Sequence, residues 1–511
     1  MRPPVLRLAL CTLPLLACDS PKASAPPADA KIAAAPESHA KALPLPDADA
    51  GSYAPAEGTI AIAQRIAGTI LVGGHVMDYE RALAEDIGAR MTGSEGLNRA
   101  AAWAEDAFRK AGIETVAHES FPLSATWTRH PVTARAVAPV ERPLHAEAVA
   151  WLQPTPREGV RGDAVYVSDL SPNAKGTPDV KGKIVLIDRD SRKGLNKKVD
   201  YVSAVTLLAK RGPLAIVSIG GRDNDVLGAG SWTRGGSAGD FVGFILGKED
   251  GAWIKRQLEH GTVTLALSND SPVGPPAQVP NVIAELKGRE SPDEWVLLGA
   301  HLDSWDFAQG AQDNGTGSAA VLEAARAIAA LKTPPRRSIR FALWAGEEQG
   351  LLGSRAYVAA HKAELDRAVY VLNTDHGSGP PKGWELATDP QIAPFHALTS
   401  PLLGTLSGDE TKTDPTCSTD HCSFMVEGVP TANLLVDDSH YDEIHHTPGD
   451  TLEKVSASAL AEAAAIVAVT AYALADAPAR LSKRQGHAAV GAMLKKAGVA
   501  DELASEGIWK P

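Results

Sequence analysis

The chain has 511 residues, which is too long for one ordinary domain and indicates roughly two or three. Hydrophobic residues make up 44% of it, so a large core can be buried. The formal net charge is −12, and this acidic balance argues against nucleic-acid binding, which leaves a basic footprint.

The N-terminus has the pattern of an export signal. Arg2 and Arg7 flank the start of the apolar stretch 5–17, which is too short to span a bilayer as a mature helix. It ends in Leu-Leu-Ala-Cys18, which resembles a bacterial lipobox. Residues 1–18 are therefore predicted to be a lipoprotein-type signal, with membrane anchoring through lipid on Cys18. The alternative is an ordinary cleaved signal, which would leave a periplasmic or extracellular protein.

Residues 19–55 are rich in Ala, Pro, Ser and Asp, and they predict a disordered tether. The segment 56–126 is expected to begin the main domain. Helices are predicted within it at 60–71, 76–89 and 97–111, the last of them clearly amphipathic.

From residue 127 to residue 279, short β runs alternate with Gly/Pro turns. The runs lie at 164–167, 183–187 and 215–219. This pattern of short strands and turns predicts a separate β-rich domain inserted into the main domain.

The segment 280–480 alternates strands with helices. Strands are predicted at 295–298, 339–344, 369–372 and 432–436, and helices at 318–331, 350–362 and 457–475. The pattern predicts an α/β fold with a mixed, largely parallel sheet flanked by helices. Residues 481–511 form a basic tail that carries little signal.

Polar residues gather just past the carboxyl ends of these predicted strands, the edge where open α/β sheets form sites. The candidate metal ligands are His301, Asp313, Glu348, Asp375 and one of His445 or His446. Each element alone is common: Glu-Glu suits a helix start, Asp-Asn-Gly suits a turn, and a His pair is usually on the surface. Their joint placement at successive strand ends favours a site.

Two imidazoles and three carboxylates suit zinc, which accepts both ligand types. The set is larger than one catalytic zinc needs. If one carboxylate bridges, each of two metals has three protein ligands and keeps open positions for water and substrate. The pattern therefore predicts two-metal hydrolysis.

Six motifs together resemble the co-catalytic zinc exopeptidases of the zinc aminopeptidase family. They are Arg90-Met-Thr-Gly-Ser, His301-Leu-Asp-Ser-Trp-Asp, Asp313-Asn-Gly, Trp344-Ala-Gly-Glu-Glu-Gln-Gly, Ser418-Thr-Asp-His and His445-His-Thr-Pro-Gly-Asp-Thr. The resemblance covers about residues 60–480. It implies the zinc exopeptidase fold, and the insert at 127–279 resembles the protease-associated domain of relatives.

The resemblance also implies a role for each polar residue and two Zn²⁺ ions per chain. His301 and Asp375 would hold one ion, Glu348 and His446 the other, and Asp313 would bridge. Glu347 would be the general base and acid. Asp303 would orient the ring of His301 without binding a metal ion itself.

By the same resemblance, the expected substrates are unblocked dipeptides or short peptides that lose their N-terminal residue, and relatives of this kind often form homodimers. Two rival functions share the scaffold: a non-catalytic receptor-type protein, which loses ligands or the base, and a glutaminyl cyclase, which works with one zinc. A third reading is a plain α/β lipoprotein with an acidic patch. No ligand or base is missing from this sequence, which favours the peptidase.

Cysteine use adds one expectation. Cys11 leaves with the signal and Cys18 would carry lipid, so Cys417 and Cys422 remain. In an oxidising compartment they can pair, and we expect a disulfide that shapes the loop carrying Asp420.

Overall fold

The computed structural model describes residues 53–172, 174–195, 200–404, 406–415 and 417–511. The predicted signal at 1–18, its lipid site at Cys18 and nearly all of the predicted tether lie outside the described residues. The described residues belong to one compact unit, 47–511.

The main sheet is eight-stranded, in the order β1-β10-β12-β11-β13-β16-β14-β15. Its strands are β1 (Thr115–Leu123), β10 (Ala277–Leu286), β11 (Ser291–His301), β12 (Arg337–Trp344), β13 (Ala368–Asn373), β14 (Pro381–Leu386), β15 (Glu410–Thr413) and β16 (Thr431–Val436). β11 pairs in parallel with β12 and β13, and β13 with β16, whereas the β1–β10, β10–β12 and β14–β16 pairs are antiparallel. The predicted mixed α/β sheet is confirmed.

Both faces of the sheet are covered, and strand β11 shows why. Alternate side chains of a strand point to opposite faces. Val296 and Leu298 enter one apolar core and Trp295 and Leu297 another. All four are fully buried, which is the continuous apolar run expected of a parallel strand covered on both sides.

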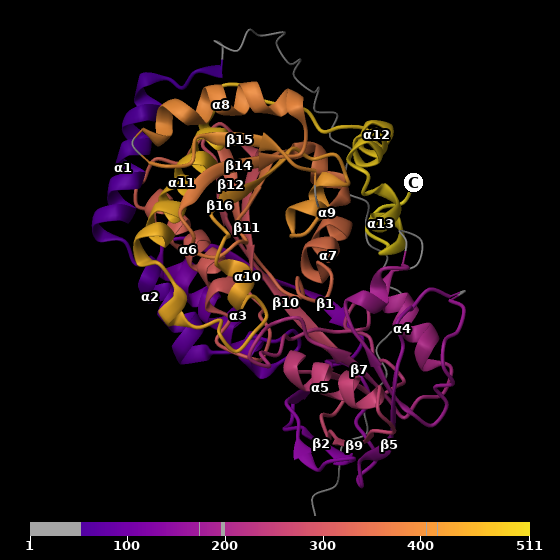
Figure 1. Ribbon diagram of the computed structural model, residues 1–511. Helices are drawn as coiled ribbons and strands as arrows, with labels where there is room; N and C mark the ends of the chain where they lie inside the picture. The colour runs from indigo at the N-terminus through magenta and orange to yellow at the C-terminus, as the bar shows by residue number, and fades with distance from the viewer. Residues whose placement is uncertain (1–52, 173, 196–199, 405, 416) are drawn as a thin grey trace, which may run out of the picture. The chain divides into compact units, whose positions relative to one another are not determined.

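Helices build these two cores on opposite sides of the sheet (Figure 1). One core contains residues of α1 (Glu57–Gly73), α3 (Glu95–Lys110), α6 (Thr316–Ala329), α8 (Asp389–Leu403) and α11 (Ala457–Asp476). The other contains residues of α7 (Leu352–Ala360) and α9 (His421–Met425). Shorter helical segments are α2 (Val76–Arg81), which continues as a π-helical turn over Ala82–Ile87, α10 (Tyr441–Ile444) and a turn at Ala311–Gly315.

Helix α11 is long and apolar enough by composition to cross a membrane, and α1 with α2 would pass the same test as one span bent by 56°. In α11, however, 78% of the apolar window is buried inside the protein. It packs against α6 and α1 as the central helix of the core.

The segment inserted between β1 and β10 forms a second eight-stranded sheet, in the order β3-β2-β9-β5-β6-β7-β8-β4. Its strands are β2 (Thr133–Ala138), β3 (Arg142–Pro143), β4 (Ala146–Ala148), β5 (Val160–Tyr166), β6 (Ile184–Ile187), β7 (Ala215–Ile219), β8 (Gly243–Leu246) and β9 (Thr264–Ser268). Helices α4 (Tyr201–Ala209) and α5 (Lys248–Leu258) accompany it, although the sequence pattern indicated only strands there. β10 begins at Ala277, so the last residues of the predicted insert belong to the main sheet.

The C-terminal tail is folded, although its sequence carried little signal. It forms α12 (His487–Ala497) and α13 (Ala500–Ser505). Leu494, Leu503 and Trp509 are buried in an apolar cluster with Leu351 and Met425 of the main domain. The tail is therefore held by side chains that come from distant parts of the chain.

Candidate metal centre

Parallel pairing brings the polar strand ends to one edge of the main sheet. His301, the last residue of β11, is in register with Trp344, the last residue of β12. β13 ends at Asn373, two residues before Asp375. Residues that follow these strands therefore meet at the carboxyl edge, as expected for an open α/β sheet.

The first cluster of candidate ligands surrounds the imidazole of His301. Its Nε2 lies 3.1 Å from Asp313 Oδ1 and 3.2 Å from Asp375 Oδ1. Its Nδ1 lies 2.9 Å from the backbone oxygen of Asp303, which can only accept, so Nδ1 carries the proton. In the neutral ring, Nε2 then turns a lone pair toward two carboxylates. Three electron-rich atoms that converge in this way offer a set of ligands to a cation.

The second cluster lies on the other side of Asp313. Asp313 Oδ2 is 3.1 Å from His446 Nε2 and 3.3 Å from His445 Nε2. His446 Nε2 is also 2.9 Å from Glu348 Oε2. Among the described ion pairs, Glu348 meets His446 and not His445. The two oxygens of Asp313 thus face two different clusters, which is the arrangement a bridging carboxylate requires.

The burial of these carboxylates supports a cation site. Asp313 and Glu348 are nearly inaccessible, and Asp313 Oδ2 and Glu348 Oε1 are buried without a well-formed hydrogen bond to the described residues. Burial raises the pKa of Glu348 to about 7, with Asp313 adding to the shift and His446 opposing it. Buried anions are costly unless a positive charge offsets them. The donor set, two imidazoles and three carboxylates, fits zinc.

Glu347 lies beside these ligands without belonging to either cluster. Its backbone N–H donates to Asp303 Oδ1 at 3.3 Å, and its side chain lines the same cavity as His301 and Glu348. Burial raises the pKa of Glu347 well above its usual range, and Asp375 adds to the shift while His301 opposes it. The chain therefore places a carboxyl group next to the candidate ligands and leaves it facing the cavity.

The cavity above the clusters has a volume of about 490 Å³. Its walls include residues that sequence patterns did not single out: His376, Asp438, Tyr441, Asp442, Glu506 and Ile508. None of these belongs to a recognisable motif. Glu506 and Ile508 come from the C-terminal tail, more than fifty residues after the last candidate ligand.

The expected disulfide between Cys417 and Cys422 is present. Cys417 and Thr419 line the cavity, so the bonded loop forms part of its wall. Asp420, inside the loop, is buried, and burial raises its pKa to about 7. The hydroxyl of Ser354 donates to this carboxyl group.

The inserted segment contacts the turn that carries the two histidines. The backbone N–H of Ala229 donates to the backbone oxygen of His446 at 2.7 Å, and the guanidinium of Arg222 donates to that of His445 at 2.8 Å. His446 has a φ of 58°, in the left-handed region that non-glycine residues seldom adopt. Such strain persists only where surrounding contacts impose it, and the insert supplies two of them.

Arg90, the first residue of the motif Arg90-Met-Thr-Gly-Ser (the opening motif), holds the loops that carry the candidate ligands. It is fully buried and donates hydrogen bonds to backbone oxygens of Leu302 (2.7 Å), Gln309 (2.8 Å), Gly310 (2.7 Å), Gly88 (3.1 Å) and Leu83 (3.3 Å). From the other side, the Asp450 carboxylate accepts from the backbone N–H groups of Gln312 (2.6 Å) and Asp313 (3.2 Å). The loop that precedes Asp313 is therefore held by Arg90 on one side and by Asp450 on the other.

Asp303 is fixed by the same opening motif. The hydroxyl of Thr92 donates to Asp303 Oδ2 at 2.8 Å. Asp303 itself holds His301 through its backbone oxygen and Glu347 through its carboxylate. Asp303 is therefore placed to orient both residues.

Replacing Arg90 by lysine is expected to weaken metal retention and to lower the melting temperature. Lysine has three donors on one nitrogen and cannot reach all five carbonyls, and each buried group left unsatisfied costs about 1–3 kcal/mol. Thermal unfolding and zinc content after dialysis against a chelator measure the effect. Arg99→Lys is the matched control, because Arg99 is exposed and makes one long-range backbone contact, to Ile87. Equal behaviour of the two variants would contradict the positioning role of Arg90.

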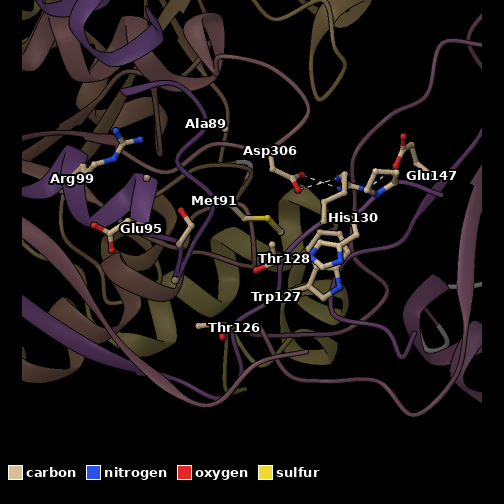
Figure 2. A pocket seen from close by; sticks show the side chains of 15 residues that line it. Ala89, Met91, Glu95, Arg99, Thr126, Trp127, Thr128, His130, Glu147 and Asp306 are labelled. Carbon is tan, nitrogen blue, oxygen red and sulfur yellow. Dashed lines mark hydrogen bonds and ion pairs between the residues drawn. The ribbon is translucent and has the colours of Figure 1, made fainter. Parts of the chain in front are cut away.

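A second cavity, of about 780 Å³, lies where the insert joins the main domain. Figure 2 shows its lining, including the start of α3 at Glu95 and the segment around Trp127 and His130. Asp306 pairs there with the guanidinium of Arg129 at 3.0 Å. None of the candidate ligands lines this cavity, so its greater volume does not make it the chemical site.

The known proteins to which this chain is similar include peptidases. The family model for Peptidase family M28 matches residues 281–471. The chain is 28% identical to carboxypeptidase Q of Xenopus laevis over 415 residues, which cover 78% of this chain and 86% of that protein. It is 26% identical to the probable lipoprotein aminopeptidase LpqL of Mycobacterium tuberculosis, over 80% of this chain and 85% of that one.

Among solved structures, the Peptidase M28 precursor from Shewanella amazonensis SB2B matches with a TM-score of 0.72 at 29% identity. The match covers 84% of this chain and 99% of that chain. The two structures therefore share the main fold. Residues 281–471, which contain every candidate ligand, match the family model for Peptidase family M28.

Proposed function

We propose that this protein is a zinc-dependent exopeptidase that hydrolyses unblocked dipeptides or releases N-terminal residues from short peptides. The observation that carries the proposal is the position of Asp313 between two clusters, with Glu347 beside them. The family match and the similarity to carboxypeptidase Q and to an aminopeptidase support it.

The ligand roles follow from the two clusters. His301 and Asp375 would hold one ion, Glu348 and His446 would hold the second, and Asp313 would be shared by both. Zinc held there would supply Lewis acidity, which polarises a carbonyl group and lowers the pKa of water to about 7.

The proposed chemistry of the chain itself centres on Glu347. Its carboxylate accepts a proton from the attacking water and then delivers it to the leaving amine, as general base and then general acid. Asp303 assists by fixing the backbone of Glu347 and the ring of His301. The Cys417–Cys422 loop, which lines the cavity, helps to enclose the reaction.

Recognition of the substrate's end is assigned to the acidic lining of the cavity. Asp375, Asp438 and Asp442 all line it. A free α-amino group is cationic at neutral pH, so it is attracted to such a wall, whereas an acetylated one is neutral. The proposed substrate therefore enters with its free N-terminus toward the carboxylates.

N-acetylation of a good dipeptide substrate is expected to lower kcat/KM strongly, because the acetylated N-terminus is neutral and loses its attraction to the carboxylates of the cavity wall. Initial rates of the free and acetylated dipeptide measure the loss. The matched control is the C-terminal amide of the same dipeptide, which keeps the amino group. Equal rates for free and acetylated substrates would reject this polarity.

The rival functions differ in simple observables. A receptor-type protein would hydrolyse no peptide. A glutaminyl cyclase would hold about one zinc and would cyclise peptides that begin with glutamine. The complete set of ligands and the base favours the peptidase over both.

Export and assembly complete the proposal. The similarity to a probable lipoprotein aminopeptidase supports an exported enzyme. We extend this to membrane anchoring through lipid on Cys18 and to assembly as a homodimer.

A further inference from the structure

We propose that the end of the C-terminal tail, residues 506–508, forms a wall of the active-site cavity and limits the length of the peptides that the enzyme accepts. This inference rests on the proposed peptidase function and names its substrate class as peptides of two or three residues. The M28 match ends at residue 471, so the wall is contributed by residues outside the family domain.

The first observation is the position of the tail. Glu506 and Ile508 line the same cavity as His301, Glu347 and His446. A peptide whose scissile bond lies at the metal clusters must fit between them and this wall. The cavity, at about 490 Å³, lies in the lower half of the ~300–1,000 Å³ range of ligand sites.

The second observation is that this wall is anchored on both sides. Leu503 and Trp509, which flank it, are 3% and 4% exposed and pack in one apolar cluster. The ring of Trp509 also stacks on His487 of α12, with centroids 4.2 Å apart. Buried residues on either side leave the short segment between them little freedom to swing away.

Hydrogen bonds from two other parts of the protein reinforce this anchoring. Arg355 of α7 donates to the backbone oxygen of Gly507 at 2.8 Å. Arg234 of the insert donates to the backbone oxygen of Ser505 at 2.6 Å. The tail therefore joins the main domain to the insert directly beside the cavity, and a long peptide could leave by this side only if those contacts opened.

The test measures how kcat/KM depends on peptide length. The substrates are alanine peptides of two, three and four residues with free termini, and the protein is the full zinc-loaded enzyme. The double variant Glu506→Ala/Ile508→Ala removes the side chains of the wall and keeps the anchors Leu503 and Trp509. Its ratio of tetrapeptide to dipeptide kcat/KM is expected to rise about tenfold or more, a discrimination typical of a misfit of side-chain size.

Two comparisons make the result decisive. Glu502→Ala/Lys510→Ala changes exposed tail residues that do not line the cavity, and it is expected to keep the wild-type ratio. Arg234→Ala/Arg355→Ala loosens the wall without altering its side chains, and it is expected to shift the ratio in the same direction. Melting curves show that each variant is folded.

An unchanged ratio in folded Glu506→Ala/Ile508→Ala, with dipeptides still hydrolysed, would overturn the length limit and leave the peptidase function standing. A wild-type preference for tetrapeptides over dipeptides would overturn it as well. Absence of hydrolysis of every peptide by the zinc-loaded wild type would instead reject the proposed function.

Discussion

Glu347→Gln is expected to lose nearly all peptide hydrolysis while it keeps its zinc. Glutamine preserves the size and the hydrogen bonding of the side chain, but it cannot accept the proton of the attacking water. Proton transfer by a positioned group typically contributes ~10²–10⁴-fold, so kcat is expected to fall by at least that order. Glu347 takes part in none of the described ion pairs of the cluster, which is why its loss should spare the metals.

The neighbouring residue provides the matched comparison. Glu348 Oε2 lies 2.9 Å from His446 Nε2, within one of the two ligand clusters. Glu348→Gln is therefore expected to lose zinc as well as activity. Metal analysis and steady-state kinetics on both variants separate the roles. If Glu347→Gln loses zinc and Glu348→Gln keeps it, the roles are exchanged, and near-normal turnover by Glu347→Gln would end the proposed mechanism.

Removal of zinc is expected to abolish hydrolysis and to destabilise the protein. Asp313 and Glu348 are both buried and both approach His446, so a bound cation adds compensation for their charges. A ligand present at 1,000 times its Kd stabilises the folded state by about 4 kcal/mol, so the chelated enzyme should melt at a lower temperature. Activity and the melting temperature should both return when zinc is added back.

The number of zinc ions per chain that restores activity tests the bridging role of Asp313. The wild type is expected to recover fully at two zinc ions per chain. His301→Ala should retain about one ion, because Glu348 and His446 are unaffected, whereas Asp313→Ala should retain neither. Full activity at one ion per chain would contradict the two-metal site and would favour the glutaminyl-cyclase alternative.

The sequence by itself determined which polar residues gather at one edge of the main sheet. Unbroken apolar runs such as Trp295–Leu298 mark buried parallel strands, because both of their faces must be covered. The polar residues just after such strands then share one sheet edge, whatever the details of packing. His301, Glu348 and Asp375 could therefore be brought together in the prediction, and the helices at 318–331 and 457–475 followed from the same local patterns.

Other features depended on contacts between distant segments. Motif likeness singled out His446 over His445, and only the structure shows that His446 is the one paired with Glu348. Arg90 stood in a recognised motif, but its five carbonyl partners come from two separate segments, 83–88 and 302–310. Hydrogen bonds of this kind leave no local pattern, because the partners are backbone atoms that every residue has.

The tail shows the same limit most clearly. Its buried residues Leu494, Leu503 and Trp509 are sparse among charged and small residues, so no periodic pattern marked a packed segment. They are buried because Leu351 and Met425, from other parts of the chain, present an apolar surface at that place. Local sequence determines which residues can perform the chemistry, whereas the shape of the cavity around them is decided only when distant segments pack together.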